Sequence, residues 1–375
     1  MIYKADGTQA YTSFDFDGTE SEKAYAHDGT EIYRKKTDYE EALFTAMGEW
    51  KSSRTNATVP LIVHTDQHTY LTNNKIFETL LSLDMNVYQG ISACLNLGDV
   101  TNYNESNFAS MSQALSYVPI EKQINIWGNH DTWIGTQNVR TPNAEEWAVL
   151  NNYFDNSEYD TQHTYNDYGI QYMIDDSNNI KYVVLGGWEY DATLGRYDYY
   201  VIGSQSMDYI IDMLSTADDN DIVIISHIQP YSQMKTASLW SHPPVEEYDP
   251  QGGGGSMSYA VGSVATNVLI DDLLNARKNK TSGSIADSYG NVHQFDFTSC
   301  TSDLLCCFAG HEHIDKYAWA NNGSIPIYIF DSYAYDDHPI YFINIDKVNQ
   351  ALDVWKVDES PQSYNYQIPF TKPVS

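Results

Sequence analysis

Imidazole, carboxylate and amide side chains gather in five short motifs, and each motif directly follows an apolar segment. The motifs are DQH at 66–68, GD at 98–99, GNHD at 128–131, a lone His227 and GHEH at 310–313. The segments before them, such as LIVHT and IVIIS, have the short apolar pattern of buried strands. Ligands of open α/β sheets collect beyond the carboxyl ends of the strands, so we expect the five motifs to converge on one crevice.

The residue types in these motifs indicate divalent metal ions. Seven side chains can supply ligands: Asp66, His68, Asp99, Asn129, His227, His311 and His313. Seven ligands are too many for one four-coordinate ion and suit two, because a carboxylate such as Asp99 can bridge ions about 3.5–4 Å apart. That spacing clamps the attacking and leaving oxygens of a phosphoryl group. Mixed nitrogen and oxygen ligation favours zinc, iron or manganese over magnesium or calcium.

The elements that must position the motifs alternate between strands and helices. A capping box at Thr37 and Glu40 begins a helix that extends to about residue 51. Further helices are predicted at about 74–83, 105–117, 204–214 and 264–279. Strands are predicted at 59–64, 92–97, 124–127, 182–185, 221–225, 304–308, 325–330, 340–345 and 352–357. This alternation indicates βαβ units in a largely parallel sheet, with a second sheet added late in the chain.

The first 36 residues carry a repeat of the tripeptide DGT, spaced eleven residues apart. Asp-Gly favours tight turns, and the aromatic residues between the turns favour strands. Residues 1–36 are therefore predicted to form a short β meander, either a flap on the main domain or a segment for attachment. Residues 37–375 would form the main domain, with long loop inserts at about 132–180 and about 230–262. The second insert contains GGGGS at 252–256, which we interpret as a native loop although it matches an engineered linker.

The composition excludes some classes of partner. Asp and Glu number 51 against 20 Lys and Arg, a formal net charge of −31. This excess argues against a nucleic-acid polymer as partner, because binders of nucleic acid neutralise phosphates with Lys and Arg. The four cysteines show no C-x-x-C spacing and are expected to be reduced core thiols. We see no apolar run of about 18 residues and no secretory signal, which leaves the location open between the cytoplasm and a virion.

The order of the motifs, D-x-H, G-D, G-N-H-D, H and G-H-x-H, resembles that of the calcineurin-like metallophosphoesterase superfamily. The resemblance spans Asp66 to His313 and implies an α/β fold, a double β-sandwich of mixed sheets flanked by helices. It implies a first metal ion held by Asp66, His68, Asp99 and His313, and a second held by Asp99, Asn129, His227 and His311. It also implies that His130 binds the substrate phosphate or protonates the leaving group, and that Asp131 orients His130.

Two further residues lie beside the motifs. His64 shares a strand face with Asp66, and we interpret it as a satisfied core histidine rather than a partner of the site. Asp315 follows the last motif and either orients His313 or has a surface or capping role.

The residues and the resemblance together predict a metal-dependent hydrolase of phosphoesters, a phosphodiesterase rather than a monoesterase. A hydroxide bridging two Mn, Fe or Zn ions would attack phosphorus in line, and His130 would protonate the leaving alkoxide. The substrate would be a small ester or a polymer of low charge density. One alternative is a bacteriophage tail or cell-surface enzyme that cleaves envelope phosphodiester polymers such as teichoic acid. The other is a catalytically inactive, metal-bound scaffold.

Overall fold

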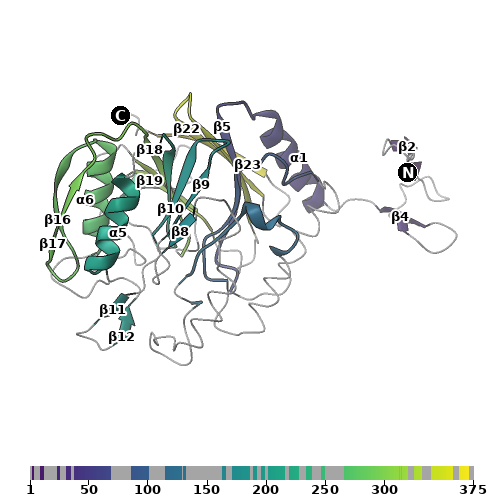
Figure 1. The fold of residues 1–375 in the computed structure, drawn as a ribbon. Helices are drawn as coiled ribbons and strands as arrows, with labels where there is room; N and C mark the ends of the chain where they lie inside the picture. Colours follow the sequence, from purple (N-terminus) through teal and green to yellow (C-terminus); the bar gives the residue numbers. More distant parts are fainter. Residues whose placement is uncertain are drawn as a thin grey trace.

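The computed structural model describes the strands and helices that carry the site. The described residues are 38–68, 86–100, 115–128, 130–131, 171–185, 202–215, 219–227, 266–311, 313, 315–319, 325–331, 339–357 and 363–370, with the backbone of short strands elsewhere. Two large sheets dominate this part of the chain (Figure 1). No helix in the described ranges is long and apolar enough to cross a membrane.

The first sheet has six strands in the order β23-β22-β21-β5-β6-β7. They are β5 (Thr58–His64), β6 (Ala93–Asn96), β7 (Gln123–Asn125), β21 (Ile340–Asp346), β22 (Ala351–Val357) and β23 (Ser363–Pro369). Strands β5, β6 and β7 are parallel, whereas β21 to β23 are antiparallel additions beside β5. A short 3₁₀ helix, η2 (Ile120–Lys122), leads into β7.

The second sheet has nine strands in the order β15-β14-β19-β20-β18-β13-β10-β9-β8. They are β8 (His163–Tyr165), β9 (Gln171–Asp175), β10 (Ile180–Val184), β13 (Asp221–Ile225), β14 (Met234–Ser238), β15 (Glu246–Asp249), β18 (Leu304–Ala309), β19 (Lys316–Trp319) and β20 (Pro326–Ile329). Its centre, β10, β13, β18 and β20, is parallel, and the strands on either side are antiparallel. Both sheets are therefore mixed.

The apolar side chains divide the molecule into four layers. Alternate residues of β5 face opposite ways, so Leu61 and Val63 join the core between the two sheets, whereas Ile62 packs under helix α1 (Asp38–Ser52). Residues of β10, β13 and β18 on the far side of the second sheet pack against helices α5 (Ser204–Ser215) and α6 (Thr266–Lys278). Figure 1 shows α1 on one side of the sheets and α5 with α6 on the opposite side. The predicted double β-sandwich flanked by helices is confirmed.

Smaller strand pairs lie outside the two sheets. β16 (Ser282–Ala286) and β17 (Val292–Asp296) form a hairpin beside α5 and α6, and β11 (Glu189–Asp191) pairs with β12 (Arg196–Asp198). Near the N-terminus, β1 (Ile2–Tyr3) pairs with β2 (Gln9–Tyr11), and β3 (Lys23–Tyr25) pairs with β4 (Glu31–Arg34). The two hairpins are separate two-stranded sheets, so the meander over residues 1–36 and the domain boundary at residue 36 stay predictions.

Three expectations about the architecture need correction. The late strands do not make a separate second sheet, because β18 to β20 join β10 and β13, whereas β21 to β23 join β5. The insert at about 132–180 is not only loop, since it contains β8 and β9, and the insert at about 230–262 contains β14 and β15. The sequences of both inserts are polar and weakly periodic, so no pattern in them predicted these strands. The predicted helix at 74–83, most of the one at 105–117 and the GGGGS segment lie outside the described residues.

Candidate metal centre

The motifs begin where parallel strands end. Strand β5 leads into Asp66 and His68, and its neighbour β6 leads into Asp99. In the other sheet, β13 leads into His227 and its neighbour β18 leads into the motif at 310–313. Hydrogen bonds continue between the loops beyond each strand pair, from Asp66 N to Gly98 O and from Gly310 N to His227 O, both 2.9 Å. The carboxyl ends of both sheets therefore deliver their motifs to one place.

Five of the site residues adopt left-handed backbone conformations. The φ angles are +53° at Asp66, +44° at His68, +52° at Asp99, +71° at His311 and +52° at His313. This conformation strains the backbone of any residue other than glycine. It persists only where the surrounding structure holds the backbone in place. Such strain concentrates at functional sites, and here it turns the loops so that the polar side chains face one another.

Two glycines make this close approach possible. A Cβ on Gly128 would overlap the carboxylate of Asp99, and its distance to Asp99 Cγ would be 2.6 Å. A Cβ on Gly310 would lie 2.6 Å from Asp66 Oδ2 and closer still to Thr65 Oγ1. Each glycine thus allows the backbone of one motif to press against a carboxylate of another.

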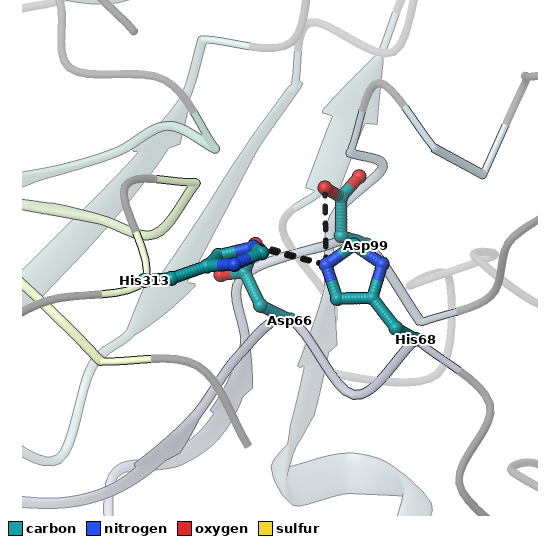
Figure 2. A group of neighbouring side chains, drawn as sticks. All are labelled: Asp66, His68, Asp99 and His313. Atoms are coloured by element: carbon teal, nitrogen blue, oxygen red, sulfur yellow. Dashed lines mark hydrogen bonds and ion pairs between the residues drawn. The ribbon is translucent and has the colours of Figure 1, made fainter. Parts of the chain in front are cut away.

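The first group of potential ligands, which we call site A, consists of Asp66, His68, Asp99 and His313. Each offers one ligand atom, and these atoms all lie within 4.8 Å of one another. His68 Nε2 lies 3.0 Å from His313 Nε2, and His313 Nε2 lies 3.1 Å from Asp66 Oδ1. Figure 2 shows the four side chains turned toward a common point. Two imidazole nitrogens and two carboxylates that converge in this way suit a divalent cation.

The second group, site B, consists of Asp99, His227 and His311, again with ligand atoms within 4.8 Å of one another. His227 Nδ1 lies 2.8 Å from Leu97 O and donates a hydrogen bond to it, which leaves Nε2 as the nitrogen that faces the site. His227 Nε2 lies 3.3 Å from Asp99 Oδ2. Asp99 belongs to both groups, as a bridging carboxylate would.

The two carboxylates divide their oxygens between the loops and the site. Asp66 Oδ2 accepts hydrogen bonds from Thr65 Oγ1 at 2.6 Å and from His311 N at 2.9 Å, whereas Oδ1 faces the imidazoles. Asp99 Oδ1 accepts a hydrogen bond from His130 N at 2.7 Å. Asp99 Oδ2 is buried and lies between the imidazoles of His68 and His227. One oxygen of each carboxylate accepts hydrogen bonds from the loops, and the other faces the imidazoles of the site.

The electrostatics of the centre attract positive charge. Burial alone would raise the pKa of Asp99, but the neighbouring His227 outweighs it and holds that pKa well below its usual range. Burial would lower the pKa of His227, yet the Asp99 carboxylate raises it to about 9. Burial lowers the pKa of His311 to about 4, which keeps this imidazole neutral. Two buried anionic carboxylates need compensating cations, and neutral imidazoles are competent ligands for them.

The GNHD motif lies at the edge of this centre. The ring of His130 is half-buried and meets the ring of His68 edge to face, with 4.7 Å between centroids. Asp131 is buried, and its Oδ2 accepts a hydrogen bond from Gly128 N at 2.7 Å, so its carboxylate holds the turn of the motif. An effect of Asp131 on the His130 ring stays a prediction. Asn129 lies outside the described residues.

The structure thus brings six of the seven predicted ligands together. Sequence reasoning missed Thr65, which binds Asp66, although its position next to the motif was a usable signal. His64 is buried and interacts through Nδ1 with Gln67, within the first motif, which fits the core role expected of it. Asp315 does not have the surface role considered for it, because it is buried in an ion pair with Lys356.

Comparison with known proteins gives only distant similarities. No family model and no curated protein matches this chain. Among solved structures, PhoD is 8% identical with a TM-score of 0.42, over 82% of this chain and 71% of that chain. GAP50, the anchor in the inner membrane complex of Plasmodium, is 9% identical with a TM-score of 0.41, over 84% and 90%. A metallophosphoesterase from Sphaerobacter thermophilus is 11% identical with a TM-score of 0.27, over 83% and 89%.

Metallophosphoesterases are among these structures, as the order of the motifs predicts. Identities and TM-scores this low carry no argument about family, substrate or activity. The case for function therefore rests on the site, where the donor set and the position of Asp99 Oδ2 between two imidazoles fit divalent ions.

Proposed function

We propose that this protein is a metal-dependent hydrolase of phosphoesters that uses two divalent ions. The observation that supports this most directly is the position of Asp99 Oδ2, which is shared between site A and site B. It is buried and lies 3.8 Å from His68 Nε2 and 3.3 Å from His227 Nε2. A bridging carboxylate in an N and O ligand set is the arrangement of two-metal phosphoesterases.

The ions, when bound, would activate a water molecule and neutralise charge on the phosphoryl oxygens. The protein's own part is to hold the reacting groups in place. Loops from both sheets fix the two carboxylates, and the hydrogen bond from His130 N to Asp99 ties the His130 backbone to the shared ligand. His130 would then bind the phosphate and donate a proton to the departing alkoxide, a contribution of roughly 10² to 10⁴ in rate.

The finer parts of the proposal concern the metals and the substrate. Four imidazoles with two carboxylates favour Mn, Fe or Zn, as the sequence predicts. We propose phosphodiesters of small molecules or of polymers with low charge density as substrates. A negative surface repels nucleic-acid polymers, whereas the charge next to the substrate would be set by the two ions.

The experiment is hydrolysis of bis-nitrophenyl phosphate by the chelated protein and by the same protein reloaded with Mn²⁺. Turnover that appears only with metal supports the proposal. The absence of metal-dependent turnover on mono- and diester substrates would contradict it and favour the inactive scaffold. A panel that includes teichoic acid separates a small-molecule esterase from an enzyme of envelope polymers.

A further inference from the structure

A buried ion pair joins Lys356 to Asp315, close to His313 in the sequence. Lys356 Nζ is 2.6 Å from Asp315 Oδ2, and the two side chains are only 1% and 2% exposed. Asp315 follows His313 by two residues and immediately precedes β19. The position of this carboxylate therefore restrains the end of the motif at 310–313.

Two further residues complete the network around Asp315. Tyr341 Oη donates a hydrogen bond to Asp315 Oδ1 at 2.5 Å. Asp331 N donates to Tyr341 Oη at 3.1 Å, and Asp331 Oδ2 lies 3.1 Å from Lys356 Nζ. Both oxygens of Asp315 are thus engaged, and the carboxylate has little freedom to move.

The network joins the two sheets. Lys356 and Tyr341 belong to β22 and β21 of the six-stranded sheet. Asp315 and Asp331 flank β19 and β20 of the nine-stranded sheet. The ion pair therefore connects the loop after β18 to the sheet on the other side of the core.

Site A depends on this connection because its ligands come from both sheets. Asp66, His68 and Asp99 follow β5 and β6 of the six-stranded sheet, whereas His313 follows β18 of the nine-stranded sheet. A small shift of the His313 loop would open the 3.1 Å approach of its Nε2 to Asp66 Oδ1. Site B has a separate tie between the sheets, the hydrogen bond of 2.8 Å between His227 Nδ1 and Leu97 O.

Stability alone is a poor explanation for the ion pair. The free energy needed to remove two charges from water can exceed the attraction between them. Apolar replacements of a buried ion pair are therefore often neutral or stabilising. An ion pair differs from apolar residues because its hydrogen bonds hold the two side chains in one defined geometry.

We propose that Lys356 is a positioning residue, which acts through Asp315 to hold His313 in site A and so sets the metal affinity of that site. The proposal rests on the proposed two-metal function. It predicts a selective effect, because site B has its own tie between the sheets. Partners that orient metal ligands typically contribute about 10- to 100-fold in metal affinity.

The test measures Mn²⁺ binding to the full chain by calorimetric titration and by electron paramagnetic resonance. Lys356→Met should weaken one of the two sites about tenfold or more and give the spectrum of isolated rather than coupled Mn²⁺. Tyr341→Phe keeps the packed ring and removes one donor to Asp315, so the same site should weaken by a smaller factor. If Lys356→Met does not fold, Tyr341→Phe is the variant that tests the proposal.

Lys181→Met is the matched control. Lys181 is also a fully buried lysine, but its Nζ donates to Met213 O at the end of α5. This variant should lose stability yet bind two ions as the parent does. His313→Ala removes a ligand of site A, and His311→Ala removes a ligand of site B. The Mn²⁺ binding of Lys356→Met should resemble that of His313→Ala.

Wild-type affinity at both sites in folded Lys356→Met and Tyr341→Phe would overturn the inference, as would equal weakening of both sites. Failure of the proposed function looks different, because the parent would then bind two ions without hydrolysing any phosphoester. In that case the selective loss of site A would still support the role of Lys356.

Discussion

Replacement of Gly128 by alanine should damage the centre through one added methyl group. The new Cβ would lie 2.6 Å from Asp99 Cγ and overlap its carboxylate, where ordinary contact needs about 3.4 Å or more. Overpacking of this kind costs about 1–3 kcal/mol. If Asp99 moves away, the hydrogen bond from His130 N is also lost, which adds about 1.5–3 kcal/mol. We therefore expect a loss of about 1–6 kcal/mol in the free energy of unfolding, together with loss of metal.

Gly48→Ala provides the matched control. Gly48 lies within α1, and a Cβ there would meet no atom within 4 Å. Alanine in a helix interior is favoured over glycine by about 0.5–1 kcal/mol, so the same substitution should stabilise the protein. Urea unfolding of both variants in a chelator, followed by Mn²⁺ titration, gives the two quantities. Gly128→Ala with unchanged stability and two bound ions would refute the packing argument.

Three further predictions concern individual side chains. His130→Ala should slow hydrolysis of alkyl phosphoesters by roughly 10² to 10⁴ but spare nitrophenyl esters, whose leaving group needs no proton; equal losses in kcat would contradict the role. Asp99→Asn should lose both ions and activity, so an active variant with full metal content would exclude a shared carboxylate. Since His227 has a pKa of about 9 without metal, Mn²⁺ must displace its proton, and affinity at site B should rise from pH 6.5 to pH 9. The metal-free protein should lose stability over the same interval, because the raised pKa stabilises the fold only while His227 is protonated; a flat profile in either titration contradicts the assignment.

Strand ends and candidate ligands could be predicted because local patterns encode them. The runs before Asp66, Asp99 and His227 are short, mostly apolar and almost entirely buried, so their length and composition identify them as strands. Polar residues that follow such strands in parallel neighbours must gather at one edge. The predicted positions of the described ligands follow from this rule alone.

Other features depend on contacts that no local pattern records. The partners Lys356 and Asp315 are 41 residues apart and meet only because two sheets pack together. The left-handed backbone at Asp66 and His313 has no glycine to signal it, since tertiary contacts impose it. Strand β9 is a mixture of polar and apolar residues, and pairing with β10 rather than periodicity makes it a strand.

Anomalous X-ray scattering from crystals loaded with Mn²⁺ tests the central claim most directly. The account predicts two peaks about 3.5–4 Å apart, with Asp99 between them. One peak should lie among Asp66, His68 and His313, and the other beside His227 and His311. A single peak, or two peaks that do not share Asp99, would contradict the two-metal centre.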